Sequence, residues 1–179
     1  MHRQHWSRVD DVLQQAGDLS GQVIITCCLP LDSSDSDLVI AHTSSGAEQL
    51  AIKLRSAAVV SAFSTTPSEV LHSAFDARSN DTRPSLVYCG DDESGKAITS
   101  QLIRDSGFDP IDAGPLRIAR YIEPFTMLIG QLAYERDESP AIAYRFERFE
   151  ERRSLVSKRF LQFTYIVTST RLGESRSQC

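Results

Sequence analysis

Two short segments hold the residues best placed to bind a ligand. Cys27-Cys28-Leu29-Pro30-Leu31 follows one apolar, β-branched run, and Ala62-Phe63-Ser64-Thr65 ends another. Ligands of open α/β sheets bind outside the carboxyl ends of the strands. We therefore take the two segments as the candidate floor of a cofactor site. The alternative is that they are ordinary loops, since every α/β sheet has such ends.

The adjacent thiols of Cys27 and Cys28 are a second candidate for chemistry. A redox role needs a lowered thiol pKa, and no basic residue stands beside them in the sequence. Cysteines at strand ends are more often small buried hydrophobes. The sequence favours this structural role, and a vicinal-cysteine redox site is the alternative.

Two polar groups stand at predicted helix starts. His42 precedes Ser45, and the free N–H groups of that helix start could hold an anion. Ser45 and Glu48 form a capping box, which is the simpler interpretation. Farther on, Arg117, Arg120, Tyr121 and Glu123 share the first turns of a long helix, where Arg120 and Glu123 could pair. That pair would lie on a solvated face or face a partner subunit.

No catalytic or metal site is predicted. The chain has no Ser-His-Asp order, no His-Glu-x-x-His and no Walker loop. Its four cysteines and four histidines do not stand at the spacing of zinc ligands.

Strands and helices must alternate to position these residues. Apolar runs predict strands at 21–29, 57–63, 85–90 and 108–113. Helices are predicted between them: one over 45–54, one that begins at Pro67 with Thr66 as its cap, and one over 91–106 with Gly107 as its left-handed cap. A helix over 5–16 precedes them. This alternation predicts an α/β fold with a doubly wound, mainly parallel sheet.

A long helix follows the last strand. It spans 115–135 and contains Pro124, and residues 140–149 suggest a short final helix. Beyond Glu151 the pattern changes to an atypical tail. The predicted organisation is a partial nucleotide-binding domain over 1–113, a helical segment with a dimerisation role over 114–150, and the tail over 151–179.

Composition narrows the classes of partner. The net charge is −5, which argues against nucleic acid as the main partner. No apolar run is long enough for a membrane helix, and the polar N-terminus does not resemble a signal peptide. Four cysteines without a Cys-x-x-Cys pair suit a reduced, cytoplasmic protein.

Several stretches resemble one known family when taken together. They are HTSSGAEQLA, AFSTTPSEVL, LVYCGDD and DAGPLRIARYIEPFTMLIGQLAY, which occur in that order over about residues 9–149. These stretches are similar to bacterial NADP oxidoreductases of the coenzyme F420-dependent type. The resemblance implies a Rossmann-like domain that binds NADP(H), a helical segment that forms a homodimer, and hydride transfer to a deazaflavin or related acceptor. It also implies that Cys28, Leu29, Pro30, Ala62, Phe63, Ser64 and Thr65 bind the cofactors.

Three departures from the family pattern stand out. The family's Thr-Asn-Pro-Leu strand end is Cys28-Leu29-Pro30-Leu31 here, and its Ala-Phe-Asn-Thr is Ala62-Phe63-Ser64-Thr65. Both amide side chains are replaced, which indicates a different acceptor or a weakened site. The third departure concerns the nine glycines, which form no Gly-x-Gly-x-x-Gly turn for the pyrophosphate.

Two hypotheses follow from the missing turn. Either the chain is a truncated oxidoreductase with impaired NADP(H) binding, or it is a non-catalytic remnant that acts as an interaction or dimerisation module. In both, the first predicted strand lacks a neighbour and becomes an exposed apolar edge.

Overall fold

The computed structural model describes residues 6–149. Residues up to Phe146 belong to one compact unit, which contains every helix and strand of the described chain, and a second unit begins at Glu147. The predicted boundaries at 113 and 150 stay predictions, and the predicted tail lies outside the described residues.

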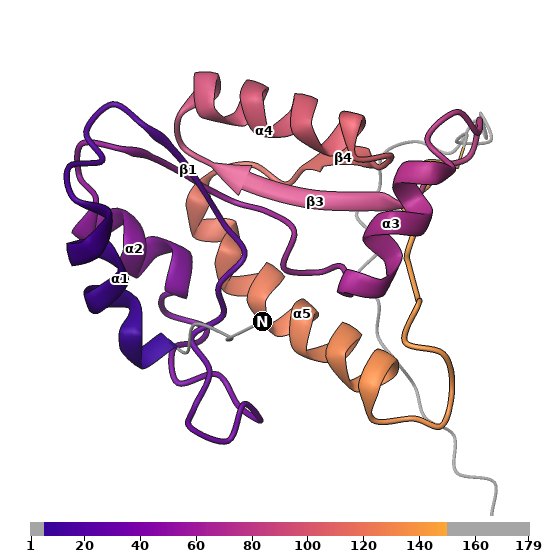
Figure 1. Ribbon diagram of the computed structural model, residues 1–179, viewed down its shortest axis with the longest axis horizontal. Coiled ribbons are helices and arrows are strands. Elements are labelled where there is room, and N and C mark those ends of the chain that lie inside the picture. Colours follow the sequence, from indigo (N-terminus) through magenta and orange to yellow (C-terminus); the bar gives the residue numbers. More distant parts are fainter. Residues whose placement is uncertain (1–5, 150–179) are drawn as a thin grey trace, which may run out of the picture. The chain divides into compact units, whose positions relative to one another are not determined.

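The fold is built on a four-stranded sheet (Figure 1). Its strands β1 (Val23–Thr26), β2 (Ala58–Ser61), β3 (Ser85–Gly90) and β4 (Asp109–Asp112) lie in that spatial order. β1 runs parallel to β2, and β3 runs parallel to β4. The predicted α/β fold with a mainly parallel sheet is confirmed. β2 and β3 are antiparallel, which the alternation of strands and helices did not predict, and only two residue pairs join them.

Helices connect these strands and cover the sheet. They are η1 (Trp6–Arg8), α1 (Val9–Ala16), α2 (Gly46–Lys53), α3 (Ser68–Asp76), α4 (Glu93–Asp105), η2 (Leu116–Ile118) and α5 (Ala119–Tyr134). The Ser45 cap of α2 is confirmed, because its hydroxyl accepts the N–H of Glu48 at 3.1 Å. The Thr66 cap of α3 is wrong. Pro67 has a ψ of 141° and precedes the first turn, and no side chain caps that helix.

Side-chain alternation along the strands divides the core between the two faces of the sheet. On one face Val59, Val87 and Cys89 pack with residues of α2, η2 and α5. On the other face Val60, Leu86 and Tyr88 pack with residues of α3 and α4. The compact unit is therefore layered as helices, sheet and helices, which is what a sheet with apolar residues on both faces requires.

The last described segment is not the helix that residues 140–149 suggested. It has no helical turns, and Tyr144 and Phe146 lie beside the start of β3, outside the part of β3 that pairs with β2. The N–H of Ser85 donates to the carbonyl of Tyr144 at 2.8 Å, and the N–H of Phe146 donates to the Ser85 hydroxyl at 3.0 Å. The unpaired N–H groups of a buried strand need acceptors, and this need outweighs the local helical spacing.

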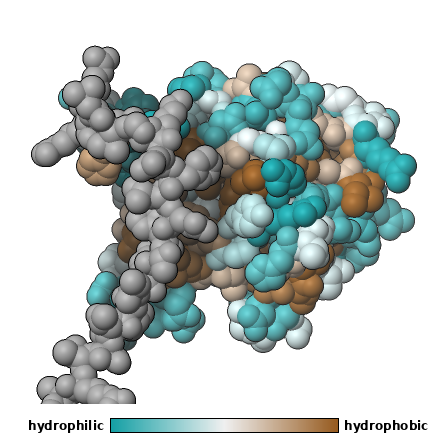
Figure 2. Space-filling model, turned by 180° about the vertical axis from the view of Figure 1, so that it is seen from behind, coloured by the Kyte–Doolittle hydropathy of each residue, from teal (hydrophilic) through white to brown (hydrophobic). Residues whose placement is uncertain are grey.

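β1 forms one edge of the sheet, as the sequence predicts. Among the described strands it pairs only with β2, and its apolar residues Val23, Ile24 and Ile25 are only partly buried. Figure 2 shows hydrophobic residues scattered among hydrophilic ones over the face opposite to that of Figure 1. Exposed apolar side chains are therefore a general feature of the described surface, and include Ile52, Ile98 and Leu128.

Candidate cofactor site

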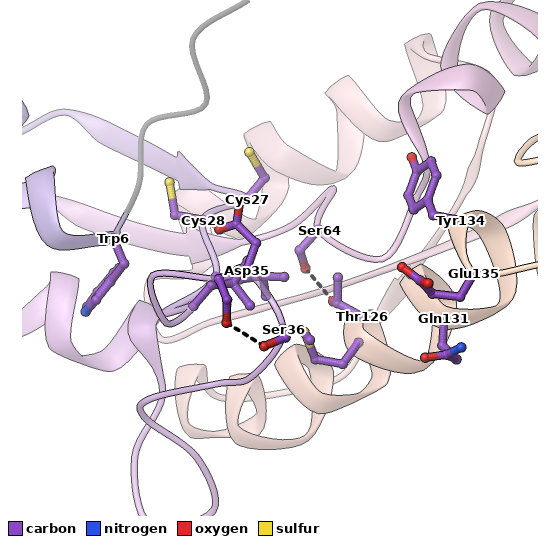
Figure 3. Close-up of a pocket in the computed structure, with 15 residues that line it drawn as sticks. Trp6, Cys27, Cys28, Asp35, Ser36, Ser64, Thr126, Gln131, Tyr134 and Glu135 are labelled. Atoms are coloured by element: carbon purple, nitrogen blue, oxygen red, sulfur yellow. Dashed lines mark hydrogen bonds between the residues drawn. The ribbon is translucent and has the colours of Figure 1, made fainter.

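An open cleft of about 1140 Å³ lies where the chain leaves β1 and β2. Its walls are the residues that follow β1, the loop Ser34–Ser36 and the second half of α5, with Trp6 and Ser64 completing them (Figure 3). The cleft is large enough for a cofactor ring system. It lies at the carboxyl ends of two neighbouring parallel strands, where open α/β sheets bind ligands.

Three of the seven predicted cofactor-binding residues line this cleft. Cys28 and Leu29 enter it from the end of β1, and Ser64 enters it from the end of β2. The Thr126 hydroxyl of α5 lies 3.2 Å from the Ser64 hydroxyl and holds it against the helix. Phe63, just before Ser64, has a φ of 65°, a left-handed conformation that a bulky residue seldom adopts. That turn directs Ser64 out of the strand and into the cleft.

The other four predicted residues are packing residues in this structure. Pro30 is fully buried, and a Cβ at Gly46 would come within 3.0 Å of its ring. Ala62 is buried in the core, and Phe63 packs beside it. Thr65 is 1% exposed, and its hydroxyl lies 2.6 Å from that of Tyr144. These residues shape the floor of the cleft from behind, and a role for all seven in cofactor binding stays a prediction.

The expectation that both neighbouring thiols are buried is wrong. Cys27 and Cys28 are exposed and line the cleft, because the chain has already left the sheet when it reaches them. Partial burial of the Cys28 sulfur raises the pKa of its thiol, and the neighbouring Cys27 raises it further. The geometry therefore supplies accessible thiols without an activated thiolate at Cys28.

The anion at the start of α2 belongs to the protein itself. The two carboxylate oxygens of Glu123 accept the N–H groups of Gly46 and Ala47 at 2.9 and 3.0 Å. Glu123 is 2% exposed, and burial raises the pKa of its carboxyl to about 7 against the two hydrogen bonds, which lower it. Glu123 and the Ser45 cap thus occupy the helix start at which the sequence allowed an external anion.

The expected pairing of Arg120 with Glu123 is also wrong. Arg120 instead holds Glu48 in a two-pronged ion pair, with Nε 2.8 Å from one carboxylate oxygen and an Nη 2.7 Å from the other. These hydrogen bonds lower the pKa of Glu48. Because Glu48 lies on α2 and Glu123 reaches the start of α2, both side chains join α2 to the first turns of α5.

Sequence reasoning missed the contribution of α5 to the cleft. Thr126, Met127, Gly130 and Gln131 line it together with Tyr134 and Glu135 near the end of the helix. Gly130 was the available signal: it stands inside a helix, where glycine is costly, and a Cβ there would meet nothing within 4 Å. A glycine that opens space on an otherwise apolar helix indicates a wall of a cavity.

The loop beside the cleft was predicted only as polar. Its shape depends on Asp32, whose carboxylate accepts the N–H groups of Ser34 and Ser36 at 3.2 and 2.9 Å. The hydroxyl of Ser34 lowers the pKa of Asp32 most, followed by the N–H of Ser36. This network holds Asp35 at the tip with a φ of 58°.

The described residues give no sign of a metal site or a membrane span. No group of three or more potential ligand side chains gathers in the part of the chain that the structure describes. Within the same residues, no helix is long and apolar enough to cross a membrane.

Comparisons with known proteins agree with this architecture. No family model matches the chain. It is 29% identical over 121 residues to the metalloreductase STEAP3 of Rattus norvegicus, in an alignment that covers 68% of this chain and 22% of that protein. It is 28% identical over 123 residues to the F420-dependent NADP reductase of Methanocaldococcus jannaschii, in an alignment that covers 66% of this chain and 53% of the reductase. The chain thus spans about half or less of the length of these curated relatives.

Solved structures show the same fold. A candidate F420-dependent NADP reductase from Arthrobacter sp. FB24 superposes with a TM-score of 0.70 at 22% identity, over 82% of this chain and 68% of that one. The hypothetical protein SMa0349 from Sinorhizobium meliloti superposes with a TM-score of 0.55 at 23% identity, over 64% of this chain and 55% of that one. The chain is therefore similar in sequence to an F420-dependent NADP reductase over about two thirds of its own length, and it shares the fold of these solved structures.

Proposed function

We propose that the cleft is the acceptor side of a hydride-transfer site, in which hydride passes between NADP(H) and a deazaflavin or related acceptor. The observation that carries this proposal is the opening of two parallel strand ends and α5 onto one cleft. The cofactors supply the redox chemistry, and the protein supplies position and exclusion of water. No acid or base is required from the chain.

The residues of this chain have positioning roles in the proposal. Cys28, Leu29 and Ser64 form the floor against which a ring would lie, with Thr126 fixing the Ser64 hydroxyl. Pro30, Ala62, Phe63 and Thr65 support that floor from the core. Glu123 and Arg120 keep α5 against α2. The wall that α5 forms therefore stays at a fixed distance from this floor.

We further propose that the 179 residues bind NADP(H) weakly by themselves. They contain no Gly-x-Gly-x-x-Gly turn, so they offer no close backbone approach to the pyrophosphate. The described residues that line the cleft also include no Lys, Arg or His that could pair with a phosphate. The family's activity therefore needs a phosphate site that these residues do not supply.

Titration with NADPH tests this proposal, with the nicotinamide fluorescence as the signal. We expect no saturation below about 100 μM, which corresponds to a binding free energy weaker than about −5.5 kcal/mol. Saturation at micromolar concentration would contradict the claim of weak binding. Gly130→Leu places a side chain in the cleft and should reduce any binding at higher concentration, whereas Gln101→Leu on exposed α4 should not.

The second candidate function is a non-catalytic dimerisation module. Its support is the exposed side of α5, where Tyr121 and Leu128 are seven residues apart and 62% and 53% exposed. Residues at that spacing lie on one face of a helix. Sedimentation equilibrium tests this candidate: a dimer that Leu128→Glu converts to a monomer supports it, and a monomeric native chain contradicts it.

A further inference from the structure

Ser64 presents a hydroxyl group to the cleft from a rigid part of its floor. The neighbouring residues Ala62 and Thr65 are buried, at 0% and 1% exposed, whereas Ser64 is partly exposed and lines the cleft. Phe63 holds a φ of 65°, a conformation that is costly for a bulky residue and persists only where the surrounding structure fixes it. The Ser64 hydroxyl is therefore held in place by the core behind it.

The hydrogen bond between Ser64 and Thr126 has a direction. The Thr126 hydroxyl donates, and it shares its one proton between the Ser64 hydroxyl at 3.2 Å (Figure 3) and the carbonyl of Ile122 at 3.0 Å. Ser64 is the acceptor in this contact, so its own proton is not used there. Within residues 6–149, which the structure describes, no group accepts the Ser64 proton.

This pattern fixes what the hydroxyl offers to a ligand. One lone pair of the Ser64 oxygen faces the Thr126 donor, and the remaining O–H is a donor at the floor of the cleft. Thr126 is 9% exposed and lies on α5, so the orienting group is itself fixed by packing. A carbonyl oxygen, which has two lone pairs and no proton, is complementary to such a donor.

We propose that Ser64 donates a hydrogen bond to a carbonyl oxygen attached to the ring that binds in this cleft, and that Thr126 is the positioning residue that directs this donor. The inference rests on the proposed function for the kind of ring, because a nicotinamide and a deazaflavin both carry such an oxygen. The hydrogen bond itself is a property of binding. One hydrogen bond between uncharged groups strengthens binding by about two- to tenfold.

Replacement of the carbonyl oxygen by sulfur tests the proposal, because sulfur is a weak acceptor of hydrogen bonds. FMN is compared with its two thiocarbonyl analogues, and NADPH is compared with its thionicotinamide analogue. Amide shift changes of the isotope-labelled chain give each dissociation constant, even where binding is weak. We expect the native chain to bind FMN or NADPH about two- to tenfold more tightly than a sulfur analogue of the same ligand.

Matched variants assign this preference to one hydroxyl. Ser64→Ala should weaken binding of the oxygen-containing ligand by about two- to tenfold and leave that of its sulfur analogue within about twofold, whereas loss of a merely structural residue would weaken both equally. Thr126→Val removes the orienting donor and should cause part of the same loss, and Thr126→Ser should restore the native affinity. Ser73→Ala removes an exposed hydroxyl of α3 outside the cleft and should change neither dissociation constant.

The two pairs of ligands distinguish the source of the carbonyl. A preference in the FMN pair places the acceptor ring against Ser64, and a preference in the NADPH pair places the nicotinamide there. The inference is overturned if none of these ligands binds, if neither pair shows a preference for oxygen, or if the preference survives in Ser64→Ala. The comparison of oxygen with sulfur in the native chain needs no variant, and circular dichroism checks that each variant is folded.

The proposed function fails separately from this inference. A chain that keeps the Ser64-dependent preference but passes no hydride from NADPH to FMN contradicts the proposed reaction and leaves the hydrogen bond in place. A chain that passes hydride to FMN without any preference for oxygen over sulfur contradicts the hydrogen bond alone.

Discussion

At the scale of single residues, the buried carboxylate of Glu123 has a role in the fold rather than in binding a ligand. Its two oxygens satisfy two of the N–H groups that every helix start leaves without an intrahelical partner. Its position in the sequence, three residues after an arginine on an amphipathic helix, suggested a surface ion pair. Only the packing of α5 against α2 shows that the side chain points inward.

The raised pKa of Glu123 predicts a pH dependence of stability. A carboxyl whose pKa rises from 4.5 to about 7 on folding contributes stability that is complete below pH 4.5 and is lost as the pH rises to about 7. The difference in unfolding free energy between the native chain and Glu123→Gln should therefore fall over that range and be constant above it. Urea unfolding across pH 4.5–8 measures this difference.

A matched variant guards that prediction against the titration of other groups. Gln101→Leu changes an exposed side chain that does not titrate, and its difference from the native chain should stay nearly constant with pH. If the difference for Glu123→Gln were equally constant, the buried carboxyl would not titrate near neutral pH.

Gly107 is a second residue that the fold constrains tightly. It ends α4 with a φ of 92°, and a Cβ there would lie 2.1 Å from the carbonyl oxygen of Ala74. Gly107→Ala should lower the unfolding free energy by at least about 2 kcal/mol, because backbone strain and a clash with the backbone both destabilise the fold. Gly114→Ala has the same strain at a φ of 102°, but its Cβ would make only an ordinary contact with Ile118 at 4.0 Å, so it should lower the unfolding free energy by about 1 kcal/mol. Equal costs in chemical denaturation would contradict this account.

At the scale of elements, the segment around Tyr144 acts as a substitute for a strand. The Tyr144 hydroxyl accepts the N–H of Val87 at 3.2 Å and lies 2.6 Å from the Thr65 hydroxyl, so it connects the end of β2 to β3. Its ring meets Phe125 of α5 edge to face, with centroids 5.2 Å apart. This side chain therefore contacts the floor and the helical wall behind the cleft.

Removal of that hydroxyl should weaken the fold. Tyr144→Phe leaves the N–H of Val87 and the Thr65 hydroxyl without their partner, which should lower the unfolding free energy by about 1–3 kcal/mol. Tyr121→Phe at an exposed position should change it by less than about 0.5 kcal/mol. Urea denaturation of both variants measures the contrast, and indistinguishable midpoints would show that the Tyr144 hydroxyl contributes nothing.

At the scale of the whole molecule, the sequence predicted the order and type of most elements. Apolar runs identified the four strands, and Ser45 and Gly107 marked helix ends, because these signals are local. The antiparallel pairing of β2 with β3 and the extended course of 140–149 could not be predicted, since both depend on which backbone groups meet across the sheet. The cleft was predicted only at its floor, because α5 reaches it from more than sixty residues away in the sequence.

NMR of the isotope-labelled chain with millimolar NADPH tests whether the cofactor binds in this cleft. We expect amide shift changes at Cys28, Leu29, Ser64 and Gly130 that do not saturate at micromolar concentration, and we expect Gly130→Leu to abolish them. Shift changes confined to the exposed face of α4 around Ile98 and Leu102, or no shift changes in the cleft, would contradict it.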